Sequence, residues 1–130
     1  PLVEAAGACE LWLDGGHNPA GGVAVAATLG RMPKKSTHLV LGMLNTKDIA
    51  GYLRPVAAQA RTLTAVSIPG EANTLSAEET QAAAAKAGIE AGTAESVVAA
   101  VTRIAAKDPG ARILICGSLY LAGRNLRENG

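Results

Sequence analysis

The sequence predicts an α/β domain, in which a mostly parallel sheet of five or six strands is covered by helices on both faces. Short apolar runs alternate along the chain with longer, alanine-rich segments of helical period, and this alternation is typical of parallel strands joined by helical crossovers. The length of 130 residues suits a single domain that buries a core without disulfides or metal. We therefore treat residues 1–130 as one domain.

The elements follow one another in a regular order. Strands are predicted at residues 11–14, 37–43, 62–68 and 112–117, with a weak, short one at 88–93. Helices are predicted at residues 19–31, 48–60, 76–87, 95–106 and 118–127. The stretch "PGEANT" at 69–74 predicts a loop within the domain and not a linker between domains.

Sequence signals mark several helix ends. Asn18 is a good N-cap and Pro19 suits the first helical position, so this helix start is explained without a functional role. Ser76, followed three residues later by Glu79, matches a capping box. Gly88 stands where the end of a helix favours a left-handed residue.

Composition excludes several classes of function. The net charge of +1 is spread without long runs of either sign, and aromatic residues make up 2% of the chain, so neither nucleic acid nor a membrane is expected as a partner. Cys9 and Cys116 are too few for a disulfide framework or a zinc site, which fits a cytoplasmic protein, and Cys116 is predicted to be a small buried apolar residue. No apolar stretch approaches the roughly 20 residues of a membrane span, and the first residues lack the features of a signal peptide. Because the chain opens without a methionine, we expect it to be a domain of a longer protein.

Ligands of parallel α/β sheets bind outside the carboxyl ends of the strands. Three stretches are expected to lie there: residues 14–18 after the first strand, 42–48 after the second and 117–120 after the last. A binding site at this edge of the sheet is therefore the first hypothesis.

The stretch "LWLDGGHNPAGG" at residues 11–22 carries the first candidates. Asp14 can accept hydrogen bonds from paired hydroxyls such as those of a ribose, and Gly15 and Gly16 let backbone approach a ligand closely. His17 can donate a hydrogen bond to a carboxylate or phosphate, or it can brace the turn. A tight turn without a ligand explains the same residues equally well.

The other two stretches carry weaker signals. Lys47 can reach a phosphate, and Asp48 is most simply a helix cap or an acid of the first turn. Ser118 suits the cap of the last helix, and its hydroxyl faces the same cleft as His17 if the first and last strands end on the same side. Dinucleotide-binding glycine spacing, a phosphate loop and a nucleophile elbow are all missing from the sequence, so no catalytic residue is assigned.

Three motifs together resemble one enzyme family. "LDGGHNPAGG" resembles the Leu-Asp-Gly-Ala-His-Asn-Pro stretch of folylpolyglutamate synthases and bifunctional dihydrofolate synthases. "LGMLNTKD" is similar to their Gly-Met-Leu-x-Asp-Lys-Asp, and "GSLYLAG" to their closing Gly-Ser-Leu-Tyr-Leu-Ala-Gly. The motifs occur in the family's order and spacing. The resemblance covers essentially the whole chain as the C-terminal domain of such an enzyme, within the Mur ligase superfamily.

The resemblance implies a Rossmann-like fold and a share in an ATP-dependent ligase that adds L-glutamate to folate through an acyl phosphate. It leaves open whether the parent enzyme also makes dihydrofolate. ATP and magnesium are implied as cofactors, held mainly by a central ATPase domain of the same chain that residues 1–130 do not include. Folate, L-glutamate and ATP are the expected small-molecule partners, a monomer is expected, and the isolated domain is expected to be inactive.

Eight residues are candidates for the site, and for Asp14, His17 and Ser118 the resemblance implies a role by position. Asp14 and Lys47 would bind the nucleotide, Asp14 at its ribose, while His17 and Ser118 would hold the glutamate. Gly15, Gly16, Asn18 and Asp48 would support the loops and cap the helices. No residue is assigned as a metal ligand. The sequence departs from the family at Asn45 and Thr46, where many members include an aspartate, and near Asn73 and Thr74, where many have a Pro-Arg pair.

Two alternatives stay open. A muramyl-peptide ligase C-terminal domain would share the fold and the type of reaction, although "GSLYLAG" argues against it. A non-catalytic regulatory module that binds a nucleotide or an amino acid would also be compatible with the missing phosphate loop. An ATPase domain upstream in the parent chain would decide for a ligase.

Overall fold

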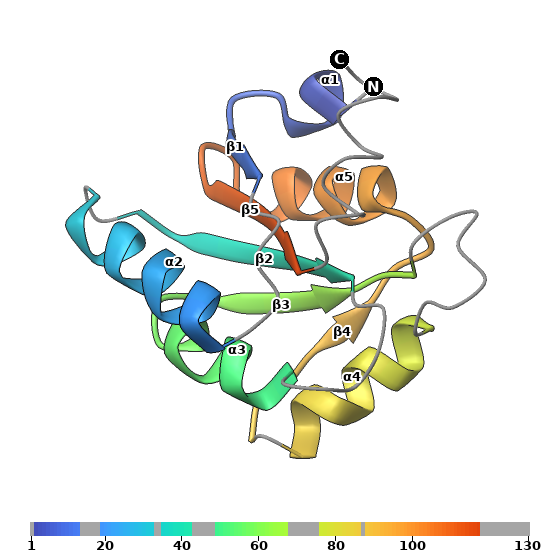
Figure 1. Ribbon diagram of the computed structural model, residues 1–130. Coiled ribbons are helices and arrows are strands. Elements are labelled where there is room, and N and C mark those ends of the chain that lie inside the picture. Colours follow the sequence, from blue (N-terminus) through green and yellow to red (C-terminus); the bar gives the residue numbers. More distant parts are fainter. Residues whose placement is uncertain are drawn as a thin grey trace.

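A parallel five-stranded sheet forms the centre of the computed structural model, which describes residues 2–13, 19–32, 35–42, 49–67, 76–86 and 88–117 (Figure 1). The strand order is β1-β5-β2-β3-β4, and every neighbouring pair is parallel. The strands are β1 (Glu10–Leu13), β2 (Thr37–Gly42), β3 (Thr62–Ala65), β4 (Gly92–Thr93) and β5 (Arg112–Gly117). The predicted α/β class is confirmed.

Five helices accompany these strands in the described ranges. They are α1 (Leu2–Ala6), α2 (Pro19–Arg31), α3 (Ile49–Ala57), α4 (Ala77–Lys86) and α5 (Val97–Lys107). Four of them lie where the sequence predicts helices, and α2 has the predicted bounds. The short α1 was not predicted, because five residues are too few to show helical periodicity. The helix predicted at 118–127 lies outside the described residues.

Helices cover both faces of the sheet, as predicted. Leu39, Leu41, Leu114 and Cys116 of β2 and β5 pack with buried residues of α2, α3 and α4. Alternate residues of the same two strands, including Val40, point to the opposite face and pack with α1 and α5 (Figure 1). Strands buried on both faces read as continuous apolar runs, which explains the "LVLG" and "ILIC" stretches. Cys116 is 1% exposed, in agreement with its predicted role.

The predicted helix ends are confirmed where the structure describes them. Pro19 opens α2, and the capping box forms at α4: Glu79 N donates to Ser76 Oγ (3.1 Å) while Ser76 N donates to Glu79 Oε1 (2.9 Å). Gly88 has φ +81°, the left-handed conformation that the sequence predicts after this helix. In the described part of the chain, no helix is both long enough and apolar enough to cross a membrane.

Helices α2 and α3 approach each other closely at Gly22. A Cβ atom added there would lie 2.3 Å from the carbonyl oxygen of Tyr52 and 2.9 Å from its Cα, both of them backbone atoms. Tyr52 is fully buried, so its backbone has little room to shift. Position 22 therefore needs a glycine for a packing reason, independent of any ligand.

We expect Gly22→Ala to lower the free energy of unfolding by about 1–3 kcal/mol, the usual cost of overpacking a tight contact. Gly30→Ala in the same helix is the matched control, because its Cβ would meet only the end of the Gln59 side chain, 3.7 Å away. That control should gain up to about 0.5–1 kcal/mol from the better helix former. Urea denaturation of both variants measures the difference, and equal stability of the two would contradict the close approach.

Candidate functional site at the carboxyl edge of the sheet

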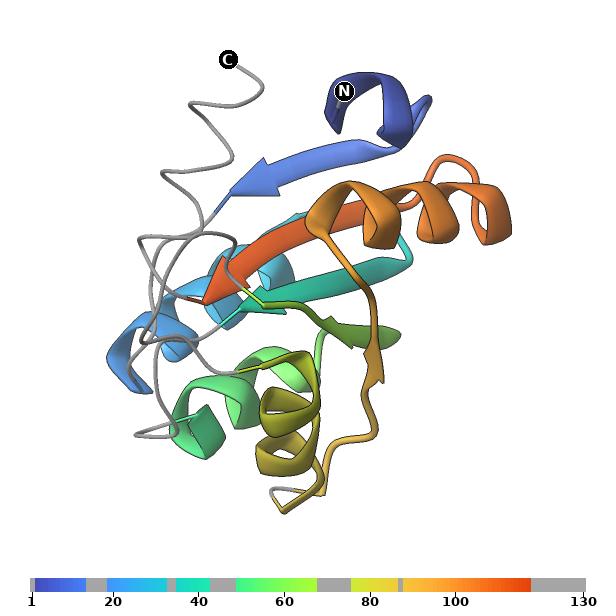
Figure 2. The ribbon, with the colours of Figure 1, turned by 90° about the vertical axis from the view of Figure 1, so that its right-hand side faces the viewer.

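Strands β1, β5 and β2 lie side by side and end at the same edge of the sheet. Leu13, the last residue of β1, pairs with Ile115 of β5. Gly42 and Gly117, the last residues of β2 and β5, pair with each other. Figure 2 shows the arrowheads of β1 and β5 pointing the same way. The first and last strands therefore end on the same side of the sheet, which is the condition under which Ser118 and His17 were predicted to face one cleft.

Helix N-termini also face this edge, because each helix that follows a parallel strand starts where that strand ends. Helix α2 starts at Pro19, α3 at Ile49 and α5 at Val97. Ser96 caps α5: it has extended backbone (φ −157°, ψ 168°), and its hydroxyl accepts a hydrogen bond from Ala99 N at 3.0 Å. Backbone amide groups at such helix starts favour an anion.

Ser67 is an anchor at this edge that is not among the residues predicted from the sequence. Its hydroxyl accepts a hydrogen bond from Ala77 N at 3.1 Å, which ties the end of β3 to the first turn of α4. The capping box holds the same helix start, and the hydrogen bonds from the backbone and side chain of Ser76 lower the pKa of Glu79 below its ordinary value. The two chain ends that flank residues 68–75 are therefore held together. A serine two residues beyond the strand was the available signal in the sequence.

All eight predicted site residues lie outside the described part of the chain: Asp14, Gly15, Gly16, His17, Asn18, Lys47, Asp48 and Ser118. The departures from the family at Asn45, Thr46, Asn73 and Thr74 lie outside it as well. Their roles stay predictions. The structure instead describes the residues on which these segments begin, Leu13, Gly42 and Gly117, and it brings those three strand ends to one edge.

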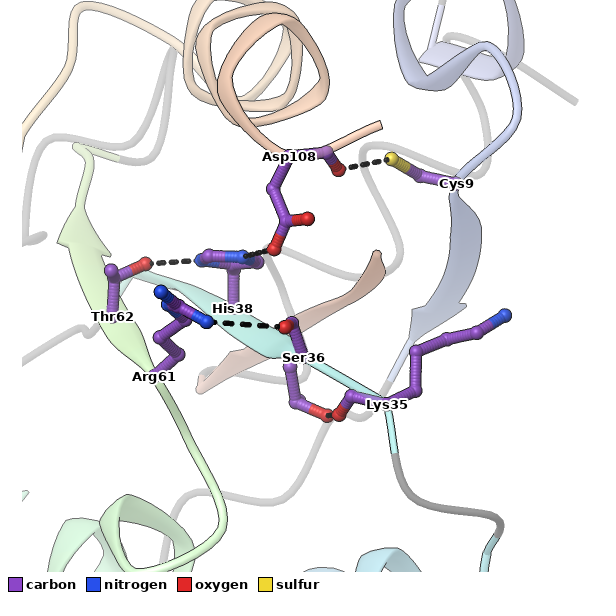
Figure 3. Close-up of polar contacts among 8 residues, drawn as sticks. Cys9, Lys35, Ser36, His38, Arg61, Thr62 and Asp108 are labelled. Atoms are coloured by element: carbon purple, nitrogen blue, oxygen red, sulfur yellow. Dashed lines mark hydrogen bonds and ion pairs between the residues drawn. The ribbon is translucent and has the colours of Figure 1, made fainter. Parts of the chain in front are cut away.

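A second polar cluster, which the sequence did not reveal, surrounds His38 at the opposite edge of the sheet (Figure 3). The ring nitrogens of His38 lie 2.6 Å (Nδ1) from Thr62 Oγ1 and 2.8 Å (Nε2) from Asp108 Oδ2. A carboxylate only accepts hydrogen bonds, so Nε2 carries the proton that is shared with Asp108. Thr62 begins β3 and Asp108 caps the end of α5, so the imidazole joins β2 to both.

The environment of Asp108 favours its ionised form. The hydrogen bond from His38 lowers the pKa of Asp108 below its ordinary value, burial opposes this shift, and the His38 charge, Ser36 and Arg61 support it. The His38 side chain is only 7% exposed, whereas that of Asp108 is 33% exposed. Both ring nitrogens of His38 have hydrogen-bond partners, and the cluster lies at the end of the strands opposite the carboxyl edge. We therefore assign this cluster a structural role.

Hollows lie beside β3 and β4. One of about 320 Å³ is lined by Thr62, Thr64 and Arg103, among others. Another of about 420 Å³ lies at the ends of α4 and α5, next to Glu78 and Glu95. Neither of these two touches the described ends of β1, β2 and β5, and we assign no ligand to them.

Metal ligands were not assigned from the sequence. Within residues 2–13, 19–32, 35–42, 49–67, 76–86 and 88–117, no group of three or more His, Cys, Asp and Glu side chains could hold a metal ion.

Residues 2–119 match the family described as "Mur ligase, glutamate ligase domain". The chain belongs to this family, because the match spans most of its length. The fold and the parallel strand ends described above agree with that membership.

Individual relatives give a consistent picture. The chain is 26% identical over 123 residues to a probable dihydrofolate synthetase of Schizosaccharomyces pombe, covering 88% of this chain and 30% of that protein. A folylpolyglutamate synthase of Mycobacterium tuberculosis complexed with ADP superposes with a TM-score of 0.77 at 28% identity, over 92% of this chain and 30% of that one. A bifunctional folylpolyglutamate synthase/dihydrofolate synthase of Yersinia pestis, complexed with AMPPNP and Mn, shares the fold with a TM-score of 0.73 at 24% identity, over 91% and 28% of the two chains. The chain thus spans about 30% of the length of these relatives.

The lowered pKa of Asp108 predicts a pH-dependent contribution to stability. Its ordinary value is 3.8, so the ionised carboxyl stabilises the fold above that pH, and the contribution disappears as the pH falls through the lower folded-state pKa. Asp108→Asn should therefore reduce the free energy of unfolding more at about pH 5 than at about pH 3. Urea denaturation across this range measures it, with the exposed Glu90→Gln as control, and a loss that does not change with pH would contradict the assignment.

Proposed function

We propose that this chain is the C-terminal glutamate-ligase domain of an ATP-dependent ligase that joins L-glutamate to folate through an acyl phosphate. The observation that carries the proposal is the register of β1, β5 and β2, which end together at one edge of the sheet. The three family motifs begin at these strand ends. Membership of the Mur ligase glutamate ligase family supports the reaction class.

Relatives support the binding of a nucleotide. The Mycobacterium tuberculosis folylpolyglutamate synthase, 28% identical to this chain, is known in complexes with ADP and with AMPPCP. A bifunctional folylpolyglutamate synthase/dihydrofolate synthase of the same fold, 22% identical to this chain, is known with Mn, AMPPNP and L-glutamate bound. We transfer the nucleotide to this chain from the Mycobacterium tuberculosis enzyme, and the glutamate from the description of the family, as part of the proposal.

Chain connectivity limits how far the predicted residues can lie from one another. Asp14 follows Leu13 directly and Ser118 follows Gly117 directly, while consecutive Cα atoms are about 3.8 Å apart. Leu13 pairs with Ile115, two residues before Gly117, so the strand ends from which Asp14 and Ser118 continue belong to adjacent strands. His17 follows Asp14 by three residues in the sequence, and we propose that it shares a pocket with Ser118.

These residues divide the work of binding between two ligands. Asp14 accepts hydrogen bonds from the ribose hydroxyls, and Lys47 contributes positive charge toward the phosphates. His17 and Ser118 donate hydrogen bonds to a carboxylate of the incoming glutamate, which orients its amine toward the activated acyl group. Placing the amine in line is the contribution of this domain to the rate, and no residue of it is assigned to acid, base or nucleophilic chemistry.

The remaining four residues support the loops. Helix α2 begins at Pro19 and α3 at Ile49, so Asn18 and Asp48 each precede a helix directly, as N-caps do. Gly15 and Gly16 leave room for backbone to approach the nucleotide. ATP, when bound, supplies the phosphoryl group that activates the folate carboxylate, and we place the magnesium ion and the phosphate loop on the ATPase domain of the parent enzyme.

One relative also favours a second substrate that would accept the glutamate. The similarity to a probable dihydrofolate synthetase makes dihydropteroate a candidate alongside folate. Glutamate ligation assayed with each acceptor separately distinguishes the two activities.

Asp14→Ala in the complete enzyme should raise the KM for ATP more than the KM for glutamate, because a ground-state contact to the nucleotide has been removed. The exposed Glu90→Ala is the control for loss of an acidic side chain away from this edge. Steady-state kinetics with each substrate varied in turn measures the effect. Equal rises for both substrates would assign Asp14 a structural role.

His17→Ala and Ser118→Ala should each weaken glutamate use by about 1–3 kcal/mol, the cost of leaving a buried polar partner unsatisfied. The double variant should lose less than the sum, since residues that share one ligand are coupled. Ser36→Ala, which removes a hydroxyl at the opposite edge, should leave kcat/KM for glutamate unchanged. Unchanged glutamate kinetics in both single variants would contradict the pocket.

A further inference from the structure

Strand β4 forms one edge of the sheet. It comprises only Gly92 and Thr93, and among the described strands it pairs with β3 alone. An edge strand presents unpaired backbone groups that can pair with another chain. The groups that cover the outer side of β4 therefore determine whether this edge can pair with a second copy of the chain.

The pairing register shows which backbone groups face outward. Gly92 is opposite Thr64, Thr93 is opposite Ala65, and Ala94 N donates to Ala65 O at 3.0 Å. In a strand, successive residues direct their backbone groups to alternate sides. The amide and carbonyl of Gly92 thus face β3, and the carbonyl groups of Ala91 and Thr93 face away from the sheet.

Two side chains donate hydrogen bonds to these outward carbonyl groups. Gln81 Nε2 donates to Ala91 O at 2.7 Å, and Arg103 Nη2 donates to Thr93 O at 2.8 Å. Gln81 belongs to α4 and Arg103 to α5, which pack on opposite faces of the sheet. The edge is therefore held from both faces, and the bond from Arg103 is charge-assisted and so the stronger type.

We propose that Gln81 and Arg103 close the β4 edge against pairing with β4 of a second copy of this chain. Two identical edges can pair antiparallel about a two-fold axis, so each outward carbonyl would find an amide donor in the partner. The side-chain donors satisfy the same carbonyl groups first, and displacing them would cost two hydrogen bonds per copy. This role does not depend on the ligase function proposed above.

The test compares the mass of the full 130-residue chain with that of a Gln81→Ala/Arg103→Ala double variant by sedimentation velocity over a range of concentrations. We expect the weight-average mass of the double variant to rise toward roughly twice the wild-type value, as two-fold pairing requires. The matched control is Arg54→Ala/Gln59→Ala, which removes the same residue types from exposed positions in and after α3 and should leave the mass unchanged.

A third variant ties any association to the edge itself. A Cβ at Gly92 would meet no atom within 4 Å, so Gly92→Lys can be added to the double variant without a clash, and a lysine on an edge strand opposes pairing. This triple variant should return to the wild-type mass. Three results would overturn the proposal: a folded double variant with the wild-type mass, association that Gly92→Lys does not reverse, or a double variant that loses its cooperative thermal transition, because the two bonds would then hold the fold.

Discussion

The position of β5 between β1 and β2 is the constraint on which the rest of the structure depends. Its backbone bonds join strands that are far apart in the chain, and its side chains enter both core layers: Ile113 and Ile115 on one face, Leu114 and Cys116 on the other. These side chains are at most 4% exposed, so shifting β5 by one residue would exchange the residues of its two faces. The same register fixes which residues leave the sheet at its carboxyl edge.

The two ends of the sheet carry different kinds of polar residues. At the amino end, side chains join elements to one another: His38 contacts Thr62 and Asp108, and Glu10 lies 3.3 Å from both Arg112 and Lys35. At the carboxyl end, the described polar contacts, such as that of Ser67 with Ala77 N, hold helix starts in place. An anchored amino end leaves the loops of the carboxyl end to bind ligands, which is the usual arrangement in parallel α/β sheets.

Local signals in the sequence predicted the elements well. Pro19 and the capping box of Ser76 and Glu79 depend on neighbours within a few residues, so the sequence contains all that is needed to recognise them. The contact of His38 with Asp108, 70 residues away, depends on strand order, which no local pattern contains. The same applies to Arg103 at the edge of β4, whose role follows from the pairing of β3 with β4. The residues of the candidate site were predicted from family motifs. The sequence also predicted that these motifs follow strands of one mostly parallel sheet. Only the pairing register shows that β1, β5 and β2 are neighbours that end at the same edge.

The most direct test of the proposed site is a crystal structure of the complete enzyme with a non-hydrolysable ATP analogue and L-glutamate. We expect a glutamate carboxylate within about 2.7–3.2 Å of the side chains of both His17 and Ser118, beside the ends of β1 and β5, with Asp14 facing the ribose. Glutamate bound away from this edge, or His17 and Ser118 on opposite sides of the domain, would contradict it.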